Sequence, residues 1–165
     1  MTAMARVRAA SYITRTGRQG PELLVFSYPT VPEAGTHLPG GGVEPGEPLE
    51  AAAIREAHEE VGITPDHIEL IGRLDDLVTN SGFLVAPFVG IIDERIDYVL
   101  QASEVEEVFE VPIEALLRPY QPEVRYVAFR EKSYPAYFYR HERHEIWGLT
   151  GRILKHFLDF VWRSV

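Results

Sequence analysis

Arg55, Glu56, Glu59 and Glu60 lie close together in the stretch "REAHEE" and could bind metal. Successive helix residues are rotated by about 100°, which puts Glu59 at about −60° and Glu60 at about +40° from Glu56. The three carboxylates therefore share one face, where they repel one another unless a cation lies between them. Carboxylate oxygens are the ligands that Mg²⁺ and Mn²⁺ prefer. Arg55 stands four residues before Glu59, so the two can pair on one flank.

The same acidic face has a second interpretation, a solvated surface, because exterior helix faces are commonly charged. The residues before the helix favour the metal site. Gly40, Gly41 and Gly42 offer backbone carbonyls and N–H groups that a ligand can approach closely, since no side chain intervenes.

Local signals predict a helix over residues 49–61. Pro48 suits a first turn, where a missing N–H costs nothing. Good helix formers follow, and Gly62 is typical of a helix end. A core-facing apolar stripe lies about 100–160° around from Glu56. It consists of Ile54, Ala57 and Val61.

The rest of the chain predicts strands before and after this helix. Segments rich in β-branched and aromatic residues are expected as strands over 7–14, 22–28, 68–79, 83–92, 106–111, 124–129 and 136–141. "NSG" after Thr79 predicts a hairpin, and the Pro and Gly content of 30–42 predicts a loop. A short helix is expected over 112–117, and helical spacing of apolar residues from Trp147 to Val161 predicts an amphipathic closing helix. We expect an α/β fold, with a mixed sheet between α-helices (α/β/α).

Composition limits the classes of function. The chain has 165 residues and no cysteine, which predicts a single domain over 1–165 with only oxygen and imidazole as metal ligands. The formal net charge of −9 argues against a nucleic-acid partner. Small phosphorylated substrates stay open, because a bound metal can locally reverse the field. With neither a membrane-spanning apolar run nor a secretory leader at the N-terminus, we expect no membrane association and a cytoplasmic location. The sequence does not decide between a monomer and a homodimer.

The full spacing of this region resembles the Nudix box. It reads Gly41, five residues, Glu47, seven residues, then "REAHEEVGI" over 55–63. Ala57 stands where a larger aliphatic residue is common. A chance match at these fixed positions has a probability on the order of 10⁻⁸ per starting point. The resemblance implies the Nudix fold and hydrolysis of a nucleoside diphosphate linked to another moiety, with Mg²⁺ or Mn²⁺.

The resemblance also implies a ligand set. The metal ligands would be the carboxylates of Glu56, Glu59 and Glu60 with the carbonyl of Gly40. Arg55 would orient the carboxylates.

Further roles follow from the same resemblance. Glu47 would support Arg55 and suits the start of the helix dipole. Glu104, before the strand over 106–111, is a candidate general base by family pattern, with a solvated loop glutamate as the alternative. Apart from the resemblance, His37 could contact substrate because it stands beside "LPGGG", and Gly41 and Gly42 could do so through their open backbone. For His37 a structural or solvated role is the alternative.

Segments outside the box are similar to the coenzyme A diphosphatase branch of this family. They are "IELIGRLDDLVTNSGFLVAPFVGII", "EVEEVFEVPIEALL" and "HEIWGLTGRIL". This resemblance implies cleavage of coenzyme A or an acyl derivative to 3′,5′-ADP and 4′-phosphopantetheine. The loop "LLVFSYPTVPEAGTHLPGG" departs from that branch, because it lacks the usual Arg-Ser and His-x-Gly elements. ADP-ribose, NADH or a dinucleotide polyphosphate therefore stays open as substrate. A third hypothesis is a non-catalytic nucleotide-sensing module, which the complete set of box carboxylates disfavours.

Overall fold

The computed structural model describes residues 6–17, 20–27, 36–92, 96–117 and 122–163. Its strands are β1 Arg6–Gly17, β2 Gly20–Ser27, β3 Thr36–His37, β4 Gly40–Gly42, β5 Glu69–Arg73, β6 Leu77–Val78, β7 Phe83–Ile92, β8 Glu107–Pro112, β9 Glu123–Phe129, β10 Lys132–His141 and β11 His144–Ile146. The helices are α1 Leu49–Val61, α2 Ile113–Leu117 and α3 Gly148–Arg163, with a 3₁₀ turn, η2, at Pro65–His67. No helix within the described ranges has the length and apolarity needed to cross a bilayer.

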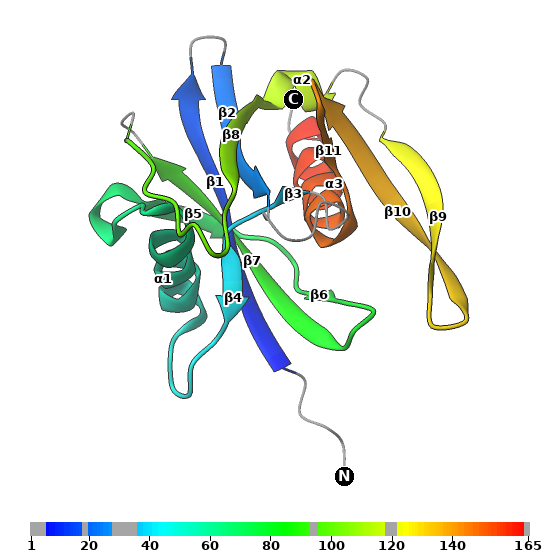
Figure 1. The fold of residues 1–165 in the computed structure, drawn as a ribbon, viewed down its shortest axis with the longest axis horizontal. Coiled ribbons are helices and arrows are strands. Elements are labelled where there is room, and N and C mark those ends of the chain that lie inside the picture. The colour runs from blue at the N-terminus through cyan, green and yellow to red at the C-terminus, as the bar shows by residue number, and fades with distance from the viewer. Residues whose placement is uncertain (1–5, 18–19, 28–35, 93–95, 118–121, 164–165) are drawn as a thin grey trace.

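Strand β1 organises the main sheet (Figure 1). It pairs in parallel with β7 and antiparallel with β2 and β4. The remaining strands extend this core in the order β3-β2-β1-β7-β5, with β6 on β7 and β8 on β2. Because parallel and antiparallel pairs occur in one sheet, the predicted mixed sheet is confirmed.

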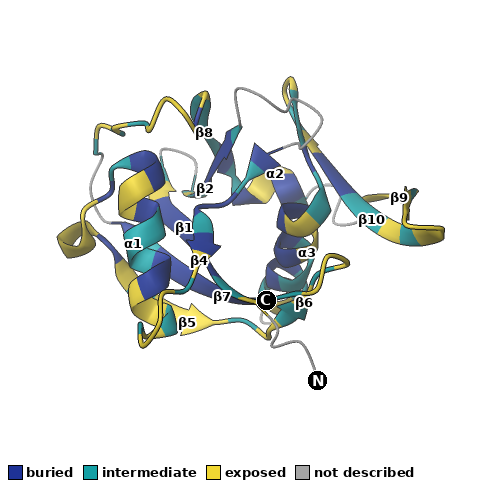
Figure 2. Cartoon of the chain, turned by 60° about the horizontal axis from the view of Figure 1, so that its bottom comes forward, coloured by how far each residue is buried: buried dark blue, intermediate teal, exposed yellow. Residues whose placement is uncertain are grey.

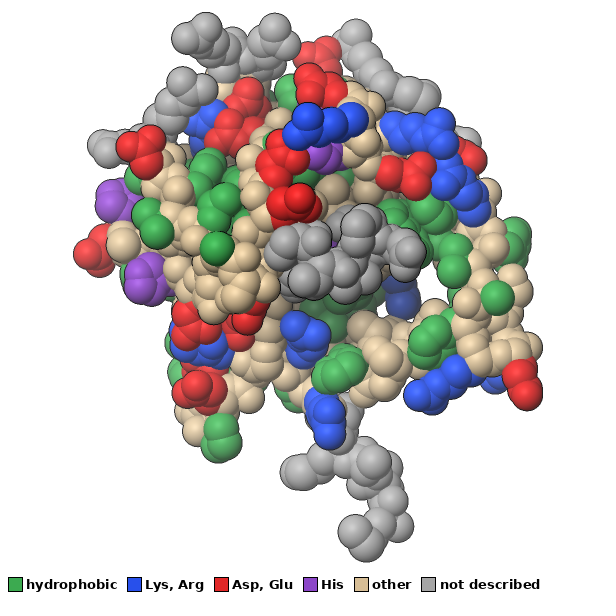
Figure 3. Space-filling view, viewed as in Figure 1, with side chains coloured by type: hydrophobic (Ala, Val, Ile, Leu, Met, Phe, Trp, Pro, Cys, Tyr) green, Lys and Arg blue, Asp and Glu red, His purple; other side chains and the backbone are tan. Residues whose placement is uncertain are grey.

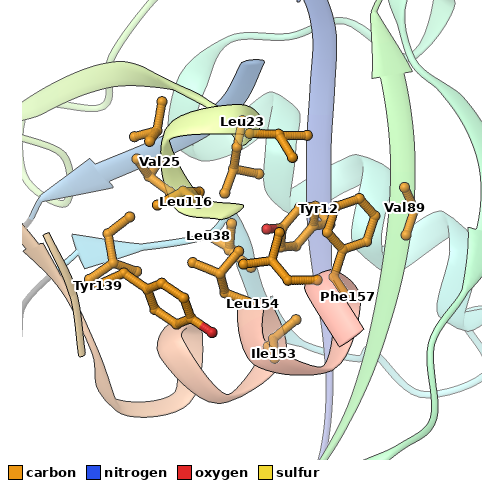
Figure 4. Packing of buried hydrophobic residues seen from close by; sticks show 14 of the residues in the cluster. Tyr12, Leu23, Val25, Leu38, Val89, Leu116, Tyr139, Ile153, Leu154 and Phe157 are labelled. Carbon is orange, nitrogen blue, oxygen red and sulfur yellow. The ribbon is translucent and has the colours of Figure 1, made fainter. Parts of the chain in front are cut away.

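Alternation along the strands builds a core on each face of the sheet. Tyr12 faces a cluster with α3 residues, and its ring lies 4.4 Å from that of Phe157 (Figure 4). The next residue, Ile13, faces the other cluster with Ala57 and Val61 of α1. Figure 2 shows α1 on one side of the sheet and α3 on the other, each with a buried stripe toward it. The α/β/α arrangement is therefore confirmed.

A second sheet has the strand order β11-β10-β9, and α3 packs against it beside the main sheet. Gly151, in the first turns of α3, lies so close to β10 that a Cβ there would come within 2.4 Å of the Tyr137 carbonyl oxygen. The helix can approach the strand this closely because the position is a glycine.

Several predicted boundaries are wrong. The single strand expected over 68–79 is divided into β5 and β6, with a register shift between Leu70 and Gly72. Both parts still pair antiparallel with β7, so the predicted hairpin is confirmed. The loop expected over 30–42 contains two short strands, β3 and β4, because these residues find partners on β2 and β1; residues 30–35 lie outside the described residues. The C-terminal helix is confirmed, but Trp147 precedes it and Leu149 is exposed.

Helix α1 matches its prediction closely. Pro48 is its N-cap and Gly62 its C-cap, in the left-handed conformation with φ 75°. Glycine is needed at position 62 for a second reason. A Cβ there would lie 2.7 Å from the Cβ of Val99 and 2.8 Å from its backbone nitrogen.

We expect Gly62→Ala to destabilise the protein more than Gly46→Ala. Both glycines have a positive φ, of 75° and 81°, and this strain costs about 1–2 kcal/mol for alanine. Only Gly62 adds overlap with a neighbouring backbone, since nothing lies within 4 Å of a Cβ on Gly46. Thermal unfolding measures the difference, and equal losses in Tm would show that the contact with Val99 adds nothing.

Candidate functional site

The glycine strand β4 lies directly against the C-terminal half of α1. Its pairing with β1 places Gly41 opposite Ala9 and Gly40 opposite Ala10. A Cβ on Gly41 would lie 2.2 Å from the carboxylate of Glu56, and one on Gly40 would lie 2.7 Å from the carbonyl oxygen of Ala9. Gly41 therefore allows the strand to approach the acidic helix, and Gly40 allows it to lie close to β1.

Glu60 is the most deeply placed of the three box carboxylates, with only 3% of the residue exposed. The backbone N–H of Gly40 donates a hydrogen bond to its Oε2 at 2.9 Å. The pKa of Glu60 is raised to about 8, mainly by burial and further by the nearby charges of Glu56 and Glu104, while the Gly40 hydrogen bond opposes the rise. The second interpretation of the acidic face, a solvated surface, therefore does not hold for Glu60.

Burial also raises the pKa of Glu56, and the charge of Glu59 adds to this effect. Hydrogen bonding and charge from Arg55 oppose it. Glu56 and Glu60 thus form a partly dehydrated pair of carboxylates that favours a nearby positive charge.

Arg55 connects the helix to the turn before it. Its Nε and Nη2 donate to the two carboxylate oxygens of Glu47 at 2.9 and 3.1 Å, and Nη2 also donates to the Gly42 carbonyl at 2.7 Å. Its Nη1 donates to Glu56 at 3.0 Å and to Glu59 at 3.1 Å. The predicted pairing of Arg55 with Glu59 is confirmed. Hydrogen bonding from Arg55 lowers the pKa of Glu47, so this carboxylate remains ionised and holds the guanidinium in place.

Glu59 lies at the solvent side of the cluster, with 51% of its side chain exposed. Among the described residues, no group of three Asp, Glu or His side chains is gathered around one point where an ion could sit. The donor set still fits a hard divalent cation. Glu56 and Glu60 are carboxylates beside a backbone that leaves space at Gly41, and a cation would compensate the charges that burial disfavours.

The loop before β8 brings Glu104 to the same place. The Gln101 N–H donates to the Glu60 carbonyl at 3.2 Å, and the Glu104 N–H donates to the Gln101 carbonyl at 2.8 Å. The charge of Glu104 is close enough to raise the pKa of Glu60. Glu107 instead pairs with Arg143, away from this cluster. Glu104 is therefore the loop glutamate that the structure brings beside a box carboxylate.

His37 lies on β3, with its ring 6.0 Å from that of Phe26. Among the described residues, His37 takes no part in the hydrogen bonds between Arg55 and the carboxylates. Gly41 and Gly42 both lie on β4, and the Gly42 carbonyl is used by Arg55.

Arg8 is a site residue that the sequence reasoning missed. Its Nη2 donates to the Gly40 carbonyl at 3.2 Å, and its charge lowers the pKa values of both Glu56 and Glu60. Its guanidinium also lies 5.6 Å from the centre of the Phe83 ring. An arginine within the apolar strand "VRAASYI" was the available signal, because a charged residue inside a buried strand needs a partner.

Comparison with known proteins decides the family. The family described as NUDIX domain matches residues 4–132, most of the chain. The chain belongs to the Nudix family. The residues that approach one another at β4 and α1 are those of the Nudix box.

Relatives carry the name "Uncharacterized Nudix hydrolase NudL". The one from Photorhabdus laumondii is 35% identical over 118 residues, which are 71% of this chain and 63% of the relative's length. The one from Enterobacter sp. (strain 638) is 34% identical over 154 residues, covering 91% of this chain and 80% of the relative. The match to the first relative thus spans less than two thirds of its length.

Solved structures share this Nudix fold. A C. elegans Ap4A hydrolase in a binary complex has a TM-score of 0.60 and 25% identity, covering 67% of this chain and 83% of the other. A NUDIX domain of Shewanella oneidensis NrtR complexed with ADP ribose has a TM-score of 0.52 at 19% identity, which shows the fold alone.

Glu60→Gln tests whether the buried carboxylate serves a cation. Glutamine keeps the size and can still accept the Gly40 hydrogen bond but carries no charge. We expect Mn²⁺ affinity to fall by more than about tenfold, since a ligand charge is lost. The Tm in excess chelator should be unchanged or higher, because burial disfavours the charged form of Glu60 and glutamine cannot ionise.

The matched control is Glu50→Gln, which removes a charge from an exposed position in the first turn of the same helix. Mn²⁺ titration and thermal unfolding are the measurements. A Glu60→Gln variant that unfolds, or one that binds Mn²⁺ as the wild type does, would show that Glu60 has a structural role and does not serve a cation.

Proposed function

We propose that this Nudix chain hydrolyses the diphosphate linkage of a nucleoside diphosphate derivative with the help of Mg²⁺ or Mn²⁺. The observation that carries the proposal is the buried Glu60 beside Glu56, held against the Gly40–Gly42 strand. Burying carboxylates side by side is unfavourable unless a cation balances them, and this cost is typical of functional sites.

Each residue of the site has a proposed task. Glu56, Glu59 and Glu60 would hold the cation with the Gly40 carbonyl. When bound, the cation supplies charge neutralisation for the diphosphate and lowers the pKa of a water nucleophile. Arg55 is a positioning residue, because it fixes Glu56 and Glu59 relative to the turn that contains Glu47.

Glu104 is proposed as the group that accepts the proton of the attacking water. The support is that its loop is tied to the end of α1 by the Gln101 N–H, which donates to the Glu60 carbonyl, and that the charge of Glu104 raises the pKa of Glu60. A general base acts within hydrogen-bond reach of the water or through one further water, and a loop anchored to the ligand helix supports this assignment.

Coenzyme A or an acyl derivative is the proposed substrate, cleaved to 3′,5′-ADP and 4′-phosphopantetheine. The support is the similarity of the segments around β5–β7, β8 and the start of α3 to the coenzyme A diphosphatase branch. The second candidate is a dinucleotide polyphosphate, which is favoured by the likeness to the C. elegans protein described as an Ap4A hydrolase. The missing Arg-Ser and His-x-Gly elements upstream of β4 also favour this second candidate.

Chelation and competition test this proposal together. We expect excess chelator to abolish turnover and added Mg²⁺ or Mn²⁺ to restore it. Coenzyme A, ADP-ribose, NADH and a diadenosine polyphosphate are then supplied at equal concentration, and we expect the largest kcat/KM for coenzyme A. Full activity in chelator would exclude the metal mechanism, and a larger kcat/KM for another substrate would exclude the coenzyme A assignment.

Single-turnover rates test Glu104 against its neighbours. We expect Glu104→Gln to be about 10²–10⁴-fold slower than wild type, the range for loss of general base catalysis. Glu106→Gln and Glu107→Gln are matched controls, since Glu106 is exposed and Glu107 pairs with Arg143. If Glu104→Gln is the mildest of the three variants, the role assigned to Glu104 is wrong.

A further inference from the structure

A groove lies outside the Nudix box, between the β9–β10 hairpin, the connection after β6 and the start of α3. Its volume is about 710 Å³. Ligand sites for small molecules commonly have volumes of about 300–1,000 Å³. Four aromatic side chains contribute to its lining: Phe129, Tyr134, Tyr137 and Trp147. Figure 3 shows the molecule hollowed beside the projecting hairpin.

The polar side of the groove is connected to the candidate site. Thr79 lines the groove, and its backbone N–H donates to the Phe83 carbonyl at 2.8 Å. The Phe83 ring lies under Arg8, which donates to the Gly40 carbonyl, and the Gly40 N–H donates to Glu60. A short series of contacts therefore joins this edge of the groove to the buried carboxylate.

Close packing fixes the side of the groove that is formed by the start of α3 and the residue before it. The ring of Trp147 stacks on Phe138 at 5.3 Å, with only 7° between the planes. Gly151 presses the helix against the Tyr137 carbonyl. Trp147 and Leu149 follow helical spacing, but both line the groove.

Arg152 provides the positive charge of this lining. Its Nη1 donates to the Val78 carbonyl at 2.8 Å, which fixes the guanidinium at the edge of the groove. Within the described ranges, the ion pairs of the structure do not include Arg152. The protein has a net charge of −9, yet this arginine has no carboxylate partner among the described residues. Its place at the edge of an aromatic groove suits a ligand that carries an anionic group attached to a flat ring.

We propose that this groove binds the nucleotide half of the substrate. The base would lie against the aromatic wall, where stacking tolerates any base, and Arg152 would contact a phosphate carried by the ribose. For coenzyme A this phosphate is the 3′-phosphate. The inference rests on the proposed function for the identity of the substrate, but nucleotide binding in the groove can be measured without turnover.

The charge is tested by binding of 3′,5′-ADP and of 5′-AMP, measured by calorimetry in the presence of chelator. We expect wild type to bind 3′,5′-ADP more tightly, and Arg152→Gln to weaken this binding about tenfold while leaving 5′-AMP unchanged. Lys132→Gln, at an exposed position of the same hairpin outside the lining, is the control and should change neither. Equal affinities of wild type for the two nucleotides, or equal losses for both in Arg152→Gln, would overturn the role of Arg152.

The aromatic wall is tested by Phe129→Ala, with Tyr126→Ala as the control because Tyr126 is a more exposed aromatic residue of β9 outside the lining. We expect Phe129→Ala to weaken 3′,5′-ADP binding about tenfold and Tyr126→Ala to leave it unchanged. If Phe129→Ala instead raises KM only for long-chain acyl derivatives and leaves 3′,5′-ADP binding intact, the groove holds the acyl arm and the proposal is wrong.

The two proposals fail separately. Nucleotide binding that depends on Arg152 and Phe129 without any hydrolysis would overturn the proposed function and keep this inference. Metal-dependent hydrolysis of a diphosphate that is insensitive to both substitutions would keep the proposed function and overturn this inference.

Discussion

The hydrogen bond from the Gly40 N–H to the Glu60 carboxylate is the contact on which the site depends. It requires a strand without side chains beside a helix, and the helix must end where Gly62 can turn the chain away. It also requires β1 to hold β4 from the opposite side, which its pairing with Gly40 and Gly41 provides. The central strand therefore supports both the fold, through β7, and the site, through β4.

The electrostatics of the site follow from this contact. Bringing Glu60 into the interior with Glu56 nearby raises the pKa values of both carboxylates, mainly by burial. Arg55 and Arg8 supply positive charge from two directions, one from the helix and the other from β1. Arg55 donates to Glu47, Glu56 and Glu59, and Arg8 donates to the Gly40 carbonyl, so the hydrogen bonds of these two arginines within the described residues do not reach the Glu60 carboxylate. The protein thus maintains a negative centre that its own basic residues position but do not fully neutralise.

Local rules were sufficient to predict α1, its Gly62 cap and the core stripe of Ala57 and Val61, because helix formation depends on neighbours along the chain. Contacts between distant segments were not predictable in this way. Strand β4 forms only because β1 lies beside it, and the burial of Glu60 follows from that pairing. Arg8 escaped notice for the same reason, because its partner lies 32 residues away. Helical periodicity likewise grouped Trp147 and Leu149 with the apolar residues of the closing helix, whereas in the structure both line the groove beside β9 and β10.

The two regions described above have different physical requirements. The carboxylate cluster depends on a close approach of the backbone at Gly40 and Gly41, where a Cβ would overlap Ala9 and Glu56, so the glycines and carboxylates occur at a fixed spacing in the sequence. The groove depends on the shape and charge of side chains on a projecting hairpin, where many residue types would preserve the fold. Replacing Arg152 would change the charge of the groove without disturbing the pairing of β1 with β4. Divergence of substrate preference on a constant catalytic scaffold is expected from this separation, because the contacts that select a ligand are not the contacts that hold Glu60 in place.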